Sequence, residues 1–170
     1  RSIAVVAVVL YHFFPSLLSL GFYGVDIFFV ISGYLITLQF IKTETRSFSS
    51  MMIDFYTRRI RRLLPVLFFV LCISSICFSF ILLQSDLVKF NSSLIASKTF
   101  WANWFFYRDG GYFGGDDQLK PLLHIWSLSV EEQFYFLFPV FFYFVLLIGV
   151  KRPYFIILLL TVPSILSLLL

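Results

Sequence analysis

The sequence predicts an all-α, polytopic transmembrane helical bundle, and three observations lead to this fold class. Of the 170 residues, 60% are hydrophobic and only 13% are charged, against roughly 25% in an average soluble domain. The mean hydropathy is +0.94, and phenylalanine alone occurs 24 times. Long apolar runs recur along the chain, separated by polar or basic segments. A soluble fold of this size would expose much of that apolar surface, so the runs are assigned to membrane helices.

Five apolar segments are expected to form helices. They are residues 1–14, 25–41, 63–83, 125–150 and 154–170. A membrane span needs about 20 residues, so the first and last segments are expected to be truncated or to continue outside this sequence. Because the chain begins with arginine rather than methionine, it is expected to be a segment of a longer protein.

The distribution of basic residues predicts how these segments cross the membrane. Most of them lie between the second and third segments or between the fourth and fifth, namely Lys42, Arg46, Arg58, Arg59, Arg61, Arg62, Lys151 and Arg152. Basic residues collect on the cytoplasmic side, so residues 42–62 are expected to be a cytoplasmic basic loop. Residues 84–122, rich in aromatic side chains, then form an extracytoplasmic loop in contact with lipid headgroups, or one that is partly re-entrant.

The sequence predicts neither a metal centre nor a disulfide. Cys72 and Cys77 lie five residues apart in one apolar run and face different directions on a helix. The two histidines are isolated in sequence, and no cysteine pair or histidine pair has metal-binding spacing. We expect no bound metal or cofactor, and no nucleic-acid partner.

The first two segments carry a candidate acid–base group. Arg1 and His12 are eleven residues apart, so they share one helix face about 16 Å apart along the axis. The pair can be explained by an arginine that snorkels to the membrane surface and a histidine at the outer boundary of the membrane. A histidine is also a natural general base. Asp26 alone is typical of a helix N-cap, yet the short turn before it brings it towards His12, where a carboxylate would orient the imidazole. Ser32 and Gly33 are interpreted as permitting close helix packing.

Four arginines form a dense cationic cluster before the third segment: Arg58, Arg59, Arg61 and Arg62. Such clusters commonly set membrane topology and contact anionic lipids. Guanidinium groups also bind phosphate oxygens in bidentate fashion, so the cluster suits a polyphosphate such as coenzyme A.

A polar stretch opens the fourth segment. Ionisable groups at a membrane helix are costly and usually face a cavity or a partner. His124 and Glu131 are seven residues apart and share one helix face, whereas Glu132 is rotated by about 100°. Considered alone, Trp126 is typical of an anchor at the membrane interface. The whole set favours a polar functional lining, and it comprises His124, Trp126, Ser127, Glu131, Glu132 and Gln133. Which glutamate faces the cavity stays open.

Four motifs in this order resemble acyltransferase family three, the integral-membrane acyltransferases that modify bacterial surface glycans. The first is Arg1 followed by ten residues and His12. The second is GVDIFFVISGYLIT, residues 24–37, and the third is FYTRRIRRLLP, residues 55–65. The fourth runs from KPLLH into WSLSVEEQFY, residues 120–135. Together they extend over nearly the whole chain.

The resemblance implies that residues 1–170 are the N-terminal part of one membrane acyltransferase domain of about ten helices. It implies that His12 is the catalytic histidine, that Arg1 is its partner, and that Arg59 and Arg62 help to hold acyl-CoA. The fourth motif is similar to that of members with a C-terminal SGNH hydrolase-like domain. A multi-pass protein of the bacterial inner membrane is therefore expected.

We therefore expect transfer of an acyl group, most simply acetyl, from the co-substrate acyl-CoA to a hydroxyl of a glycan or its lipid-linked precursor. Lipopolysaccharide O-antigen, exopolysaccharide and peptidoglycan are the candidate acceptors. His12 would remove the hydroxyl proton, with Asp26 or Glu131 orienting it or balancing its charge. Direct transfer and a covalent relay both remain open. The alternative is a proton-coupled transporter, since intramembrane His, Asp and Glu also build proton relays.

Overall fold

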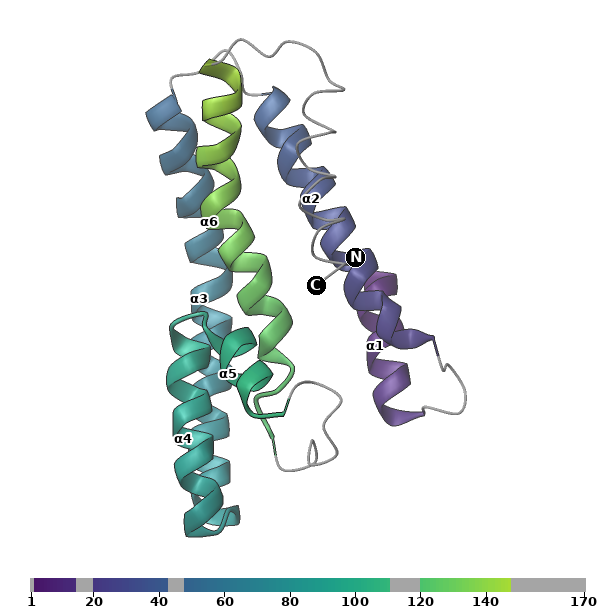
Figure 1. Ribbon diagram of the computed structural model, residues 1–170, viewed down its shortest axis with the longest axis vertical. Coiled ribbons are helices and arrows are strands. Elements are labelled where there is room, and N and C mark those ends of the chain that lie inside the picture. The colour runs from purple at the N-terminus through teal and green to yellow at the C-terminus, as the bar shows by residue number, and fades with distance from the viewer. Residues whose placement is uncertain (1, 15–19, 43–47, 111–119, 148–170) are drawn as a thin grey trace. The chain divides into compact units, whose positions relative to one another are not determined.

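The computed structural model describes residues 2–14, 20–42, 48–110 and 120–147, and the regular structure of these residues is entirely helical (Figure 1). The helices are α1 (Ser2–Phe13), the 3-10 turn η1 (Gly21–Tyr23), α2 (Gly24–Lys42), α3 (Phe48–Ile81), α4 (Gln84–Lys98), α5 (Ala102–Arg108) and α6 (Ile125–Leu147). The all-α class expected from the sequence is confirmed. The expected helix at 154–170 lies outside the described residues.

Two stretches among the described residues are long and apolar enough to cross a membrane, judged by length and composition. They are Gly21–Phe40, which includes most of α2, and Phe48–Ile81, which is α3. Contacts divide the chain into two units, residues 1–133 and 134–170. The first unit holds everything from α1 to the beginning of α6, including all the residues discussed below as sites.

Two segments expected to be loops are instead helical. Helix α3 begins at Phe48, so most of the expected basic loop 42–62 is the first half of a helix of 34 residues. This half is amphipathic: Phe55 is buried, and its ring packs 5.4 Å from that of Phe40 in α2. Hydropathy averaged along the sequence does not detect such a helix, because its charged face cancels its apolar one.

The expected aromatic loop 84–122 contains α4 and α5. Helix α4 is polar on average, yet Ser93 and Ser97 are buried. Their hydroxyls donate to Phe90 O and Ser93 O of the same helix, both at 2.7 Å. Because these hydroxyls are satisfied locally, a serine-rich helix can be packed without unpaired donors.

The core of the first unit joins four parts of the chain. Helices α3 and α4 pack side by side (Figure 1), and α5 closes over them together with the segment that leads into α6. The buried residues of this cluster are Leu67 and Leu71 of α3, Phe90 of α4, Ala102 and Phe106 of α5, and Leu122 and Ile125. This core fixes the beginning of α6 against the middle of α3.

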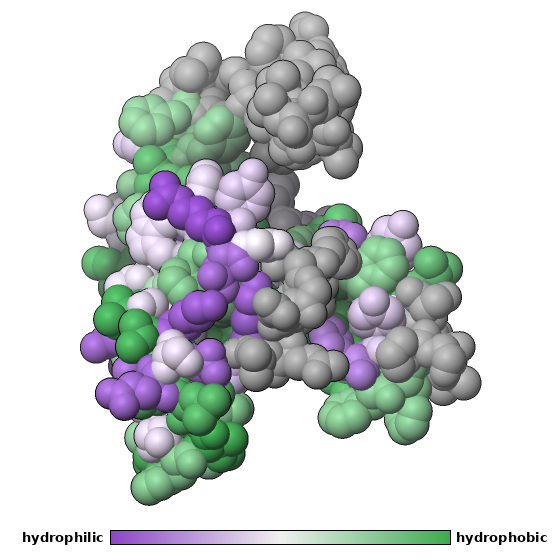
Figure 2. All heavy atoms as spheres, turned by 60° about the horizontal axis from the view of Figure 1, so that its bottom comes forward, coloured by the Kyte–Doolittle hydropathy of each residue, from purple (hydrophilic) through white to green (hydrophobic). Residues whose placement is uncertain are grey.

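Large apolar side chains remain exposed on the outer faces of the helices. Examples are Ile3 of α1, Val30 of α2 and Phe80 of α3, which are 88%, 72% and 86% exposed. Figure 2, which brings the lower end of Figure 1 forward, shows hydrophilic side chains gathered in one zone with hydrophobic side chains on either side. Such exposure suits a lipid environment rather than water.

The second unit is described for residues 134–147, the later part of α6. Its aromatic side chains repeat every four residues. The ring of Phe138 lies 5.0 Å from that of Phe134 and 5.9 Å from that of Phe142. A spacing of four places these rings on one face of the helix, so they form a continuous aromatic stripe.

Replacing Gly24 with alanine is expected to loosen the pairing of α1 with α2. A Cβ atom at this position would lie 2.5 Å from Ala4 O and 2.8 Å from Val8 Cγ2, so the helices would have to separate. We expect a loss of about 1–3 kcal/mol, measured as a lower thermal midpoint of the full-length protein in detergent. Gly33→Ala is the matched control, because nothing lies within 4 Å of its Cβ position. Equal midpoints for the two variants would contradict the predicted contact.

Candidate active site

A cavity of about 380 Å³ lies within the first unit, and it is lined by parts of α2, α3 and the beginning of α6. Its wall combines charged and apolar side chains from segments that are far apart in sequence. The lining residues are Phe28, Arg59, Arg62, Leu63, Val66, Leu67, Val70, His124, Ile125, Leu128, Glu131 and Glu132. Ligand pockets commonly have this composition, with mostly apolar walls and a few charged groups.

Helix α3 supplies the cationic part of the cavity. Arg59 and Arg62 are three residues apart and therefore lie on one helix face, followed by the apolar side chains Leu63 and Val66. The Arg59 Cζ atom lies 5.7 Å from the centre of the Phe55 ring, a cation–π contact that restrains the guanidinium.

The other two arginines of the predicted phosphate-binding cluster do not line the cavity. Arg58 and Arg61 are both exposed on other faces of α3. The physical reason is the helix itself: at about 100° per residue, the four arginines are spread over roughly 160° of its circumference, with Arg59 and Arg62 at one side of this arc and Arg58 and Arg61 at the other. The resemblance to the family, which singles out Arg59 and Arg62, agrees with this geometry.

The beginning of α6 supplies the acidic part of the cavity. His124, Leu128, Glu131 and Glu132 recur at intervals of three or four residues and all line the same space. Both glutamates thus contribute to the wall. Glu131 is buried, whereas Glu132 is only partly covered.

Glu131 is held by a hydrogen bond that the sequence did not predict. The hydroxyl of Ser32, in the middle of α2, donates to Glu131 Oε1 at 2.8 Å, and the two residues are 2% and 8% exposed. We expected Ser32 and Gly33 to serve close helix packing. For Gly33 this expectation is wrong, since nothing lies within 4 Å of its Cβ position. The signal in the sequence that could have indicated this partner was Ser32 itself, a single serine within an apolar helix.

The charges of α3 and α6 compensate each other inside this unit. The carboxylate of Glu132 lies within electrostatic range of both the Arg59 guanidinium and the Glu131 carboxylate. Two neighbouring carboxylates repel each other, and an arginine beside them offsets this repulsion. The cavity can therefore hold two acidic groups close together.

His12, the predicted catalytic histidine, lies at the end of α1. Its Nδ1 atom is 2.9 Å from Val8 O. A carbonyl oxygen only accepts hydrogen bonds, so Nδ1 carries the proton and Nε2 is the basic nitrogen of the neutral ring. His12 does not line the cavity of about 380 Å³.

The two histidines, far apart in sequence, act on each other electrostatically. Desolvation by the surrounding protein lowers the pKa of His124, even though part of its ring is exposed. A hydrogen bond with the backbone of Pro121 raises this pKa, and repulsion from His12 lowers it further. His124 is therefore neutral near pH 7, where it acts as a hydrogen-bonding group rather than as a cation.

Two of the residues predicted to line a site instead hold the beginning of α6 in place. The ring of Trp126 packs edge-on against Phe29 of α2, with centroids 6.4 Å apart. The hydroxyl of Ser127 donates to His124 O at 3.2 Å, which supports the first turn of the helix. Neither side chain lines the cavity.

Gln133 likewise connects helices rather than lining the cavity. Its Nε2 donates to Phe100 O at 2.7 Å and to Asn103 Oδ1 at 3.0 Å. Its Oε1 accepts a hydrogen bond from Asn103 Nδ2 at 3.1 Å. This reciprocal amide pair fixes α5 to α6 one turn beyond Leu128 and next to Glu132.

Arg1 and Asp26 are the remaining predicted residues. Arg1 lies outside the described residues. Asp26 is exposed in the first turn of α2. Among the hydrogen bonds and ion pairs of the described residues, none joins Asp26 to His12, so the contact expected between them is not observed.

The comparisons with known proteins identify the class to which this chain belongs. The family model described as acyltransferase domain matches residues 1–170, so the chain belongs to acyltransferase family three, a membrane family. Within it, O-acetyltransferase OatA of Staphylococcus aureus strain NCTC 8325 is 37% identical over 139 residues, which are 82% of this chain and 23% of that protein. A putative O-acetyltransferase of Staphylococcus aureus strain COL is 38% identical over 156 residues, 91% of this chain and 25% of that protein.

The chain thus spans about a quarter of the length of these relatives. No solved structure matches it.

Replacing Ser32 with alanine is expected to destabilise the packing of α2 against α6. The change removes the hydroxyl donor of a buried carboxylate, which costs about 1–3 kcal/mol. The thermal midpoint of the full-length protein should fall, and Ser32→Thr, which retains the hydroxyl, should restore part of the loss. Ser79→Ala is the control, because that hydroxyl donates only to Ile76 O of its own helix in an exposed position. A midpoint unchanged by Ser32→Ala would refute the role of this hydrogen bond.

Proposed function

We propose that this chain forms part of a membrane O-acyltransferase that transfers an acetyl group from acetyl-CoA to a hydroxyl of a cell-surface glycan. The observation that carries the proposal is the composition of one cavity. Arg59 and Arg62 stand on the same apolar-walled space as His124, Glu131 and Glu132. Phosphate-binding groups and acid–base groups are the two sets of side chains that such a transfer requires.

The donor would bind at the arginine end of the cavity. Two guanidiniums on one helix face suit the phosphates of coenzyme A, because each can donate two parallel hydrogen bonds to phosphate oxygens. The apolar side chains that follow on α3, among them Leu63, Val66 and Val70, would cover the pantetheine arm and the acyl group.

The chemical step would use His12 as general base. His12 does not line the cavity, but it lies within electrostatic range of His124, which does. With its proton on Nδ1, His12 accepts the proton of the acceptor hydroxyl at Nε2. The hydroxyl oxygen forms a bond to the acyl carbon, the carbon–sulfur bond breaks, and the coenzyme A thiolate takes the proton back from the imidazolium. The neutral form of His124 avoids a second positive charge beside this imidazolium.

The membrane setting follows from the charge distribution. The α3 arginines would lie on the cytoplasmic side, where acyl-CoA is made, and α5 on the opposite side, where a glycan is found. The relatives named as O-acetyltransferases support acetyl as the transferred group. For the whole protein, we propose a multi-pass location in the bacterial cytoplasmic membrane. The full-length chain would also contain the remaining helices of the domain and a C-terminal SGNH-like domain.

Replacing His12 with alanine is expected to abolish transfer. A positioned general base contributes about 10²- to 10⁴-fold to a rate. The measurement uses the full-length protein in membranes with radiolabelled acetyl-CoA and follows the label into the glycan fraction. Phe13→Ala is the control, since this neighbouring side chain is 75% exposed on α1. Normal labelling by His12→Ala at an equal protein level would remove His12 from the mechanism.

The arginines are expected to separate into two functional pairs. The double variant Arg59→Gln, Arg62→Gln should raise the Kd for acetyl-CoA at least about tenfold, because both charged hydrogen-bond donors are lost from the cavity. The double variant Arg58→Gln, Arg61→Gln removes the same net charge from exposed positions and should change the Kd by less than about twofold. Calorimetric titration of full-length protein in nanodiscs measures both constants. Equal effects would favour a role in topology and lipid contact instead.

A further inference from the structure

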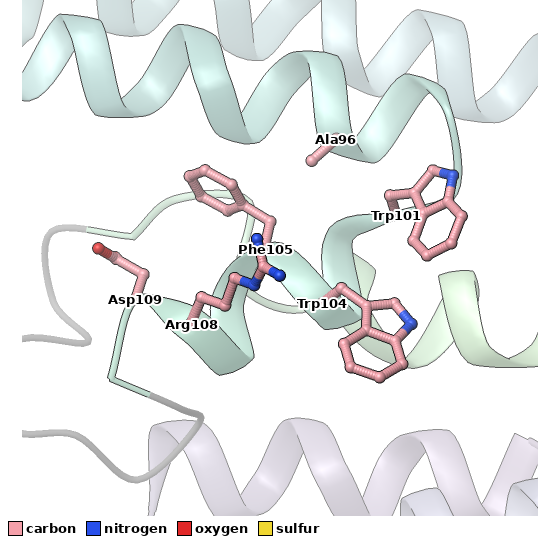
Figure 3. A pocket seen from close by; sticks show the side chains of 6 residues that line it. All are labelled: Ala96, Trp101, Trp104, Phe105, Arg108 and Asp109. Atoms are coloured by element: carbon pink, nitrogen blue, oxygen red, sulfur yellow. The ribbon is translucent and has the colours of Figure 1, made fainter.

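A second cavity, of about 670 Å³, lies in the first unit over α4 and α5 (Figure 3). It shares no lining residue with the cavity described above. Its wall is made by Ala96, Trp101, Trp104, Phe105, Arg108 and Asp109. Aromatic rings and charged groups are therefore combined around one hollow.

The two kinds of side chain are separated within this cavity. Figure 3 shows the indole rings of Trp101 and Trp104 at one end, and Arg108 and Asp109 towards the other, with the ring of Phe105 beside Arg108. The tryptophans are 58% and 53% exposed, so broad ring surface is available to a ligand. An indole offers an apolar face for stacking and an N–H group for hydrogen bonding.

The charged end is partly fixed by the protein itself. Lys120 Nζ donates to Asp109 O at 2.8 Å and lies 3.6 Å from Asp109 Oδ2. Among the ion pairs of the described residues, none involves Arg108, whose guanidinium is exposed at the cavity. Asp109 is thus held in position by Lys120, while Arg108 presents hydrogen-bond donors.

These features favour one class of occupant. A lipid chain or an apolar helix lying in the cavity would remove water from Arg108 and Asp109 without replacing their hydrogen bonds, which is costly. A pyranose ring has C–H faces that stack on an indole and hydroxyl groups that bond to a guanidinium or a carboxylate. It satisfies both ends of the cavity at once.

We infer that this cavity is a subsite for the pyranose units of a glycan chain. The inference rests on the proposed function and extends it: the acceptor would be held at sugar units away from the hydroxyl that is acylated. The reciprocal pair of Asn103 and Gln133 ties α5 to the turn of α6 that carries Glu132. The glycan subsite and the acid–base groups are thereby attached to one helix.

The test uses full-length protein in nanodiscs and two probes, a tetramer of β-1,4-linked N-acetylglucosamine and the methyl glycoside of the single sugar. For Trp104→Ala, the KM for the tetramer should rise about tenfold, whereas the KM and kcat for the single sugar and the Kd for acetyl-CoA should not change. Phe80→Ala, which removes an even more exposed aromatic ring from α3, is the control. An unchanged KM for the tetramer would overturn the inference.

Direct binding separates this inference from the proposed function. Titration of the tetramers of N-acetylglucosamine and of glucose by calorimetry requires no acyl transfer. Binding that Trp104→Ala weakens, without any labelled product from wild type, would support the subsite and refute the transferase. Acyl transfer by wild type without such binding would support the transferase and refute the subsite. The part of the tryptophan fluorescence that Trp104→Ala removes reports on this side chain. Its quenching by brominated lipid chains, unaffected by either tetramer, would show a bilayer contact and overturn the subsite.

Discussion

The buried hydrogen bond between Ser32 and Glu131 is the contact on which the geometry of the candidate active site depends. A carboxylate enclosed by apolar helices is tolerated only when its oxygens have hydrogen-bond partners. Ser32 supplies one from the middle of α2, and this fixes the rotation of α6 about its own axis. With Glu131 directed at α2, the helix repeat places His124 and Glu132 on the same cavity as Arg59. A helix rotated by one residue would lose all of these relations together.

Charge compensation explains why so many ionisable groups occur in so apolar a chain. Arg59 lies within range of Glu132, which in turn is adjacent to Glu131. The Arg59 charge offsets the repulsion between the two neighbouring carboxylates and so lowers the cost of holding both of them in an apolar unit. Arg59 is further restrained by the ring of Phe55, which itself packs on α2 through Phe40. Arg62 lines the same cavity and would bring a second positive charge to an anionic ligand.

The sequence predicted the helical class, which follows from composition and long apolar runs, and it predicted the ionisable residues that line the cavity, but not its apolar wall. The spacing of His124 and Glu131 placed them on one helix face, whereas Arg59 and Arg62 were singled out among four arginines by the resemblance to the family. The sequence could not predict partners between helices. Ser32 with Glu131, and Gln133 with Asn103, are contacts between residues far apart in the chain. Helix α4 was missed for a related reason: its serines look polar in sequence but bond within their own helix.

Helix α6 links the two cavities, and this has a consequence for how an acyl donor and a glycan would meet. Its first turns carry the acidic wall of one cavity, and Gln133 binds the helix that forms the other. A side chain amide that donates two hydrogen bonds and accepts one cannot slide along its partner without losing all three. The register of α5 against α6 is therefore fixed, and with it the placement of the tryptophans relative to Glu132. A transferase acting on a long polymer benefits from such a fixed register, because it selects which hydroxyl along the chain reaches the acid–base groups.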